Sequence, residues 1–188
     1  MVTYHDRRRV SRWESPVGGF VGALCHDGGM SESTSDATRG SLYEFAGGSA
    51  AIGALAAAHH ERCVVEPEIS HAFSHGTDPD HVAHLAAYLS EVFGGPDIYS
   101  RQLGGQPYMI GLHCGNGIPD GWAERFTACF VAAIEDAGLP SDPEFRAALR
   151  AYMEWATADV HRRSAEGAGS PHDLRMPRWS WSGLVGES

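Results

Sequence analysis

Glycine and proline residues divide residues 41–163 into segments of helix length, and this division is the strongest constraint on the fold. The alanine-rich segment 49–65 predicts a helix, because alanine has the highest helix propensity, and Pro67 ends or kinks it. A short helical turn over residues 42–46 precedes that helix. No segment alternates polar and apolar residues over a sustained length, so we expect almost no β-strand. The sequence therefore predicts an all-α domain.

Prolines also mark the starts of four more expected helices: from Asp78-Pro79 to about Phe93, from Pro107 through His113, from Pro119 to about Ala137, and from Asp142-Pro143 to about Arg163. An aspartate cap followed by proline in the first turn is a typical helix start. A glycine-rich loop is expected from Gly94 to about Gln106. These segments predict one domain over 41–163, between a mobile N-terminal extension over 1–40 and a C-terminal tail over 164–188.

The charge pattern excludes several classes of partner. The formal net charge is −10, and the 14 basic residues are all arginine. An acidic surface repels nucleic acid and anionic membranes, so we expect neither as a partner. No apolar run approaches the ~20 residues that span a bilayer. The four cysteines are Cys25, Cys63, Cys114 and Cys129. They are widely spaced and contain no CxxC pair, so we expect reduced thiols in a cytoplasmic protein.

Eleven histidines are many for a chain of this length. His81, His84, Leu85 and Tyr88 have offsets of zero, three, four and seven, so they share one helix face. His113 stands in a segment too short to form a stable helix alone, and a metal–imidazole bond would anchor it. Each of these histidines could instead be a surface or hydrogen-bonded residue. A further alternative is a zinc or non-haem iron site in a helical bundle, formed by His59, His60, Glu61, His81 and His84.

Several motifs then follow one another in a specific order: Gly47-Gly48, Phe73 in the turn before a helix, Gly94-Gly95-Pro96, Ile98-Tyr99-Ser100, Met109 four residues before His113, and Met176-Pro177-Arg178-Trp179. In this order and spacing, residues 42–158 resemble the group II truncated haemoglobins, the short two-over-two globins of bacteria and plants. The resemblance implies a truncated globin fold, a two-over-two helical sandwich around haem b (iron protoporphyrin IX).

The resemblance also implies roles for individual residues. His113 is expected to be the axial iron ligand, and it would be oriented through its other ring nitrogen. The distal pocket would be lined by His60, Phe73, His81, Leu85 and Phe126. Further haem neighbours would be Met109, Ile110 and Phe130, with Tyr88 on the face of His81. His84 and Arg101 would reach the propionates.

Two positions depart from the family pattern. The family usually has tyrosine at the position of His60 and tryptophan at that of Phe126, so both customary hydrogen-bond donors are gone. His60 and His81 can instead donate to a bound ligand, act as acid or base on peroxide, or bind the iron themselves.

Two functional hypotheses follow from this pocket. The first is peroxidase-like or nitric-oxide-detoxifying redox activity, which would need an external electron donor. The second is non-catalytic transport, carriage or sensing of dioxygen, nitric oxide or sulfide. Either function suits a monomer or a homodimer.

Overall fold

The structure is a computed structural model, and it describes residues 39–73, 78–113, 118–163 and 173–186. The predicted all-α class is confirmed. The helices are α2 (Leu42–Ala46), α3 (Ser49–Val65), α4 (His81–Val92), α5 (Ile98–Gln102), α6 (Gly105–His113), α7 (Trp122–Asp136) and α8 (Pro143–Arg163). A 3₁₀ turn, η1 (Ser70–Phe73), follows α3, and two short strands, β1 (Trp179–Ser180) and β2 (Gly183–Leu184), form an antiparallel hairpin. None of the described helices has the length and hydropathy to cross a membrane.

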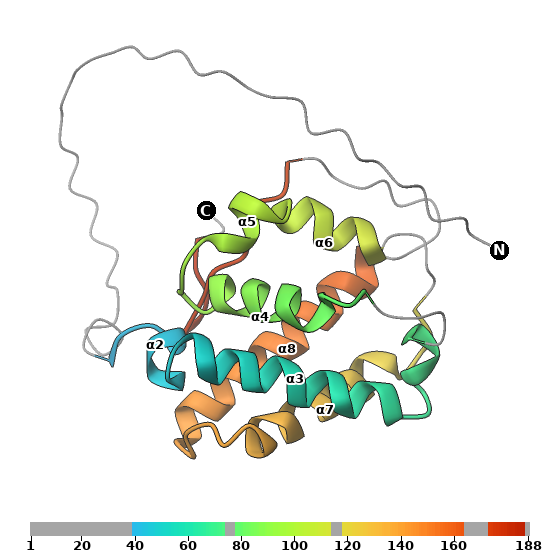
Figure 1. The fold of residues 1–188 in the computed structure, drawn as a ribbon, viewed down its shortest axis with the longest axis horizontal. Helices are drawn as coiled ribbons and strands as arrows, with labels where there is room; N and C mark the ends of the chain where they lie inside the picture. Colours follow the sequence, from blue (N-terminus) through green and yellow to red (C-terminus); the bar gives the residue numbers. More distant parts are fainter. Residues whose placement is uncertain (1–38, 74–77, 114–117, 164–172, 187–188) are drawn as a thin grey trace, which may run out of the picture. The chain divides into compact units, whose positions relative to one another are not determined.

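Two helix pairs form the body of the domain. Helix α3 packs against both α4 and α7, and α7 packs against α8. In Figure 1, α4 lies between α3 and the segment formed by α5 and α6. The C-terminal half of α3 meets the N-terminal end of α4, where the His60 and His81 rings lie side by side.

Local hydrogen bonds explain where two of the helices begin. Ser41 and Glu44 form a capping box at α2, in which the Glu44 N–H donates to Ser41 Oγ at 3.1 Å and the Ser41 N–H donates to Glu44 Oε2 at 2.9 Å. At α8, the Phe145 N–H donates to Asp142 Oδ1 at 2.8 Å, as the sequence predicts for an aspartate cap. Both caps satisfy backbone groups that a helix end leaves unpaired.

The predicted cap at Asp78 is wrong. Helix α4 begins at His81, and its N-cap residue, Asp80, makes no side-chain cap bond. The Asp80 N–H donates to Asp78 Oδ1 at 2.9 Å, so the Asp78 carboxylate closes the turn before the helix instead.

The predicted loop from Gly94 to Gln106 is also wrong, because it contains α5 and the start of α6. A buried carboxylate explains the position of α5. Glu91 Oε2 accepts the Ser100 N–H at 2.8 Å, and the Arg178 guanidinium lies 3.9 Å from Glu91 Oε1. Arg178 comes from the C-terminal segment, so α5 depends on a contact that a local sequence pattern does not reveal.

The glycine pair after α4 allows a close approach of backbone to backbone. A Cβ atom on Gly95 would lie 2.7 Å from the Ser90 carbonyl oxygen and 2.8 Å from the Tyr43 ring. The Tyr43 N–H donates to the Phe93 carbonyl at 2.9 Å across the same contact. Glycine at this position therefore lets α2 pack on the end of α4.

The C-terminal segment joins the hydrophobic core. Trp179 is buried, and its Nε1–H donates to the Ala148 carbonyl of α8 at 3.0 Å. The Trp181 Nε1–H donates to the Gly40 carbonyl at 2.9 Å, and the Arg39 guanidinium stacks 4.1 Å from the Trp181 ring. Segments from both ends of the described chain therefore meet beside α8.

Candidate functional site

His113 is the last residue of α6 and is half-buried. Its Nδ1 lies 2.8 Å from the Met109 carbonyl oxygen, one helical turn earlier. A carbonyl oxygen only accepts, so Nδ1 must carry a proton, and in the neutral ring Nε2 then keeps its lone pair. This arrangement fixes both the tautomer and the orientation of the ring, and it suits an imidazole that binds a metal through Nε2.

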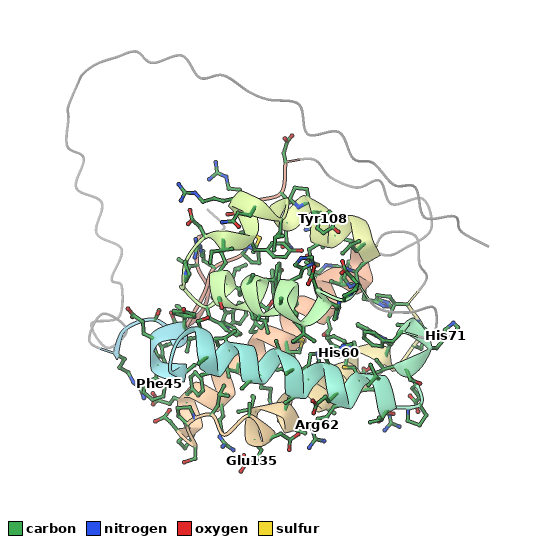
Figure 2. All side chains as sticks on the ribbon, viewed as in Figure 1. Phe45, His60, Arg62, His71, Tyr108 and Glu135 are labelled. Atoms are coloured by element: carbon green, nitrogen blue, oxygen red, sulfur yellow. The ribbon has the colours of Figure 1, made fainter. Side chains whose placement is uncertain are left out.

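Two further imidazoles come from α3 and α4. His60 lies on the side of α3 that faces α4 (Figure 2), and its ring centroid is 5.1 Å from that of His81. Phe73 of η1 contacts both rings edge-on, at 5.3 Å from His60 and 5.9 Å from His81. The structure therefore brings together three residues that the sequence assigns to a distal pocket.

His60 Nδ1 is a buried polar atom that has no hydrogen-bond partner. Among the side chains that the structure describes, no other buried nitrogen or oxygen atom shares this condition. Leaving such a group unpaired costs about 1–3 kcal/mol, so proteins rarely retain one without a use for it. The atom is available to a bound molecule.

Burial lowers the pKa of His81, because desolvation disfavours the cation. The neighbouring His60 lowers the same pKa further, whereas the Asp78 carboxylate raises it. His113 also belongs to this group of interacting imidazoles, since its charge acts on His81. His81 is therefore neutral at neutral pH, a state in which one ring nitrogen donates and the other accepts.

Aromatic rings form an apolar wall beside the imidazoles. The Phe126 ring of α7 stacks on Trp122 with centroids 4.5 Å apart, and it meets the His59 ring edge-on at 4.5 Å. Phe130 is buried behind them and contacts His59 at 5.3 Å. Phe126 and Phe130 therefore both contact the His59 ring.

His59 also belongs to this wall, although the family resemblance does not imply a place for it in the pocket. Its side chain is 1% exposed, and burial, followed by the nearby His60 and His81, lowers its pKa to about 3. Successive residues of a helix point about 100° apart, so His59 faces α7 while its neighbour His60 faces α4. Two adjacent histidines in an apolar helix are the signal that could have indicated one buried imidazole and one lining the site.

The other predicted site residues have mixed positions. Ile110 is fully buried, and Leu85 and Met109 are partly buried against the main core. Tyr88 is buried in the core, and its hydroxyl donates to Gln106 Oε1 at 2.8 Å. His84 Nδ1 lies 3.9 Å from the Asp78 carboxylate, and Arg101 pairs with Asp97 at 3.3 Å on the exposed side of α5. The structure does not place Arg101 among the imidazoles.

The alternative zinc or non-haem iron site finds no support. Within the described part of the chain, no three histidine, cysteine, aspartate or glutamate residues are arranged to hold a metal ion. The residues fit haem better, because His113 offers one oriented Nε2 and the distal residues offer an unpaired nitrogen between aromatic rings.

Comparisons with known proteins agree with this interpretation. A sequence model of the family described as bacterial-like globin matches residues 41–160. The haemoglobin of the thermophilic phototrophic bacterium Chloroflexus aurantiacus is 26% identical, with a TM-score of 0.56 over 64% of this chain and 97% of its own. The group II 2-on-2 haemoglobin of Agrobacterium tumefaciens is 25% identical, with a TM-score of 0.56 over 70% of this chain and 97% of its own.

The group II truncated haemoglobin of Bacillus anthracis is 20% identical, with a TM-score of 0.57 over 64% of this chain and 90% of its own. At that identity the likeness concerns the fold alone. No curated protein sequence matches the chain. The similar structures therefore share the helical arrangement that carries His60, His81 and His113 here.

Proposed function

Since the chain belongs to the bacterial-like globin family, whose members bind small ligands at haem iron, we propose that His113 is the axial ligand of haem b and that His60 and His81 act on the molecule bound opposite it. The main support for this proposal is the hydrogen bond from His113 Nδ1 to the Met109 carbonyl at 2.8 Å, which leaves Nε2 free to bind iron. The proposed activity is redox chemistry on a peroxide or on nitric oxide.

Haem supplies an iron centre that binds small ligands and exchanges electrons. The residues of the chain supply the proton chemistry. Cleavage of a peroxide requires a proton to move from one oxygen atom to the other, and a neutral imidazole can accept and then return it. His60 Nδ1 is buried and unpaired, so we assign the proton transfer to this atom.

His81 has a supporting role in the proposed chemistry. Its ring lies 5.1 Å from the His60 ring, and it is held neutral by burial. We assign it the second hydrogen bond to the ligand, and the exchange of a proton with Asp78 and His84 at the start of α4. Phe73 and Phe126 would keep bulk water from the ligand, which strengthens both hydrogen bonds.

The axial role is tested with His113→Ala. We expect the purified wild-type protein to show a Soret band, and the variant to bind haem more than about 100-fold more weakly because its only oriented ligand is gone. Free imidazole should restore part of that binding. His161→Ala is the control, since it removes an exposed histidine at the C-terminal end of α8 that has no assigned part in haem binding, and it should leave the affinity within a few-fold. A variant that keeps wild-type affinity would show that His113 does not hold the iron.

The redox proposal is tested by peroxide turnover with an external one-electron donor, comparing wild type, His60→Ala and free haem. We expect wild type to be fastest and His60→Ala to lose about 10²–10⁴-fold, the usual contribution of a general acid or base. If wild type and variant both run no faster than free haem, peroxidase activity is excluded. Slow autoxidation with reversible oxygen binding would then identify a carrier or sensor, and nitric oxide consumption is measured on the same samples.

A further inference from the structure

Two free thiols, one on α3 and one on α7, lie in the same small buried cluster. Cys63 is 1% exposed and Cys129 is 8% exposed, and both are free cysteines. Together with Ile69 they form a small hydrophobic cluster separate from the main core. Sequence spacing gave no sign of this pair, because the two residues come from helices far apart in the chain.

The pair is adjacent to the pocket on both helices. Cys63 follows His60 by three residues on α3, and Cys129 follows Phe126 by three residues on α7, so each thiol lies one turn from a pocket residue. Cys63 Sγ also lies 3.7 Å from both ring nitrogens of His59. A change in the separation of the two sulfurs would therefore move the helices that carry His60 and Phe126.

We propose that Cys63 and Cys129 are a redox modification site, at which a peroxide-class oxidant joins them in a disulfide that links α3 to α7. The Cys63 sulfur attacks one oxygen of hydrogen peroxide, the O–O bond breaks, and a sulfenic acid and one water form. The Cys129 sulfur then displaces the hydroxyl group, which leaves as a second water. Both thiol protons depart in these waters, and the peroxide is the two-electron oxidant.

The geometry limits how and when the bond forms. A disulfide needs the two sulfurs about 2.05 Å apart, closer than any contact between free thiols, so the two side chains must approach each other before the bond forms. Burial raises the pKa of both thiols, which keeps the reactive thiolate scarce. The site therefore responds to sustained oxidant rather than to a brief pulse.

This modification requires neither haem nor the proposed activity, so its test is independent of both. The full-length protein as purified is treated with hydrogen peroxide or with diamide, alkylated with N-ethylmaleimide, and mapped by peptide mass spectrometry without reduction. We expect one peptide that joins Cys63 to Cys129, lighter than the sum of its two parts by two hydrogens and split by dithiothreitol. Diamide separates thiol oxidation from any peroxide chemistry at haem.

Variants decide the assignment. Cys63→Ala and Cys129→Ala should each abolish the joined peptide, whereas Cys25→Ala and Cys114→Ala should keep it. Oxidation should raise the Tm of the wild-type protein by roughly 10 °C, reversibly, because the cross-link closes a long loop of the unfolded chain. Fully alkylated Cys63 and Cys129 after prolonged treatment, a bond to a different cysteine, or an unchanged Tm would overturn the proposal.

Discussion

The imidazole pocket, formed by His60, Phe73 and His81, differs from the aromatic core around α8 in how its buried polar groups are paired. In the core, the Tyr88 hydroxyl donates to Gln106 Oε1 at 2.8 Å, Thr157 Oγ1 donates to the Met153 carbonyl at 2.8 Å, and the Trp179 indole donates to the Ala148 carbonyl at 3.0 Å. In the pocket, His60 Nδ1 has no partner. The core pairs its buried polar groups, whereas the imidazole pocket leaves one buried nitrogen unpaired.

The difference extends to charge. Glu91 is buried beside the core, yet its carboxylate accepts the Ser100 N–H and lies 3.9 Å from the Arg178 guanidinium. His59 and His81 instead avoid charge, because burial lowers the pKa of each imidazole. The buried carboxylate keeps its charge because it is paired, whereas the buried imidazoles stay neutral because burial disfavours their cations.

The largest predicted effect concerns the tryptophans of the two regions. Trp179→Ala should lower the free energy of unfolding by about 3–5 kcal/mol, because it removes a buried indole together with its hydrogen bond to the Ala148 carbonyl. Trp122→Ala, in the half-exposed wall of the pocket, should cost only about 1–2 kcal/mol. Urea unfolding measures both values, and equal losses would remove the distinction between the regions.

The second prediction concerns how the free energy of unfolding depends on pH. The pKa of His59 is about 3 in the folded protein against 6.5 when exposed. Below pH 6.5 the unfolded chain binds a proton that the folded chain does not, so the stability is present above that pH and is lost as the pH falls toward 3. Between pH 7 and pH 4 this loss amounts to about 3 kcal/mol.

The test is the pH dependence of unfolding in His59→Phe, with exposed His71→Phe as control. The His59 variant should lose less stability on acidification than wild type, and the His71 variant should follow wild type. If all three proteins lose stability in parallel, His59 is not a buried neutral imidazole.

The smallest predicted change in the free energy of unfolding is an increase in the imidazole pocket and a decrease in the core. In the haem-free chain, His60→Leu should raise the free energy of unfolding by about 1 kcal/mol, because an unpaired buried nitrogen is replaced by apolar atoms. Tyr88→Phe should lower it by about 1 kcal/mol, because Gln106 loses its partner. Chemical denaturation tests the pair, and a destabilised His60→Leu would show that this nitrogen is satisfied.

Much of the helical framework could be predicted, because its signals are local. Alanine content places α3, the Asp142 cap places α8, and the absence of alternation excludes long strands. Helix α5 could not be predicted, since its Ser100 N–H is held by Glu91. Asp78 is of a residue type that often caps helices, but its carboxylate closes the turn before α4.

The candidate site divides in the same manner. His113 is indicated by the order of motifs around it, and its bond to Met109 follows from the four-residue spacing on one helix. His60, Phe73 and His81 come from separate elements, and only an overall resemblance brings them together in advance. Their ring contacts and the unpaired Nδ1 of His60 depend on how α3 meets α4.

The helix-forming segments, the net negative charge and the number of imidazoles follow from the amino-acid order alone, since propensity, capping and charge are properties of single residues and their neighbours. Folding alone establishes which imidazole is buried, which is unpaired, and that Cys63 and Cys129 share one cluster. These outcomes depend on the packing of α3 against α4 and α7, and burial and proximity arise only when distant segments exclude water together.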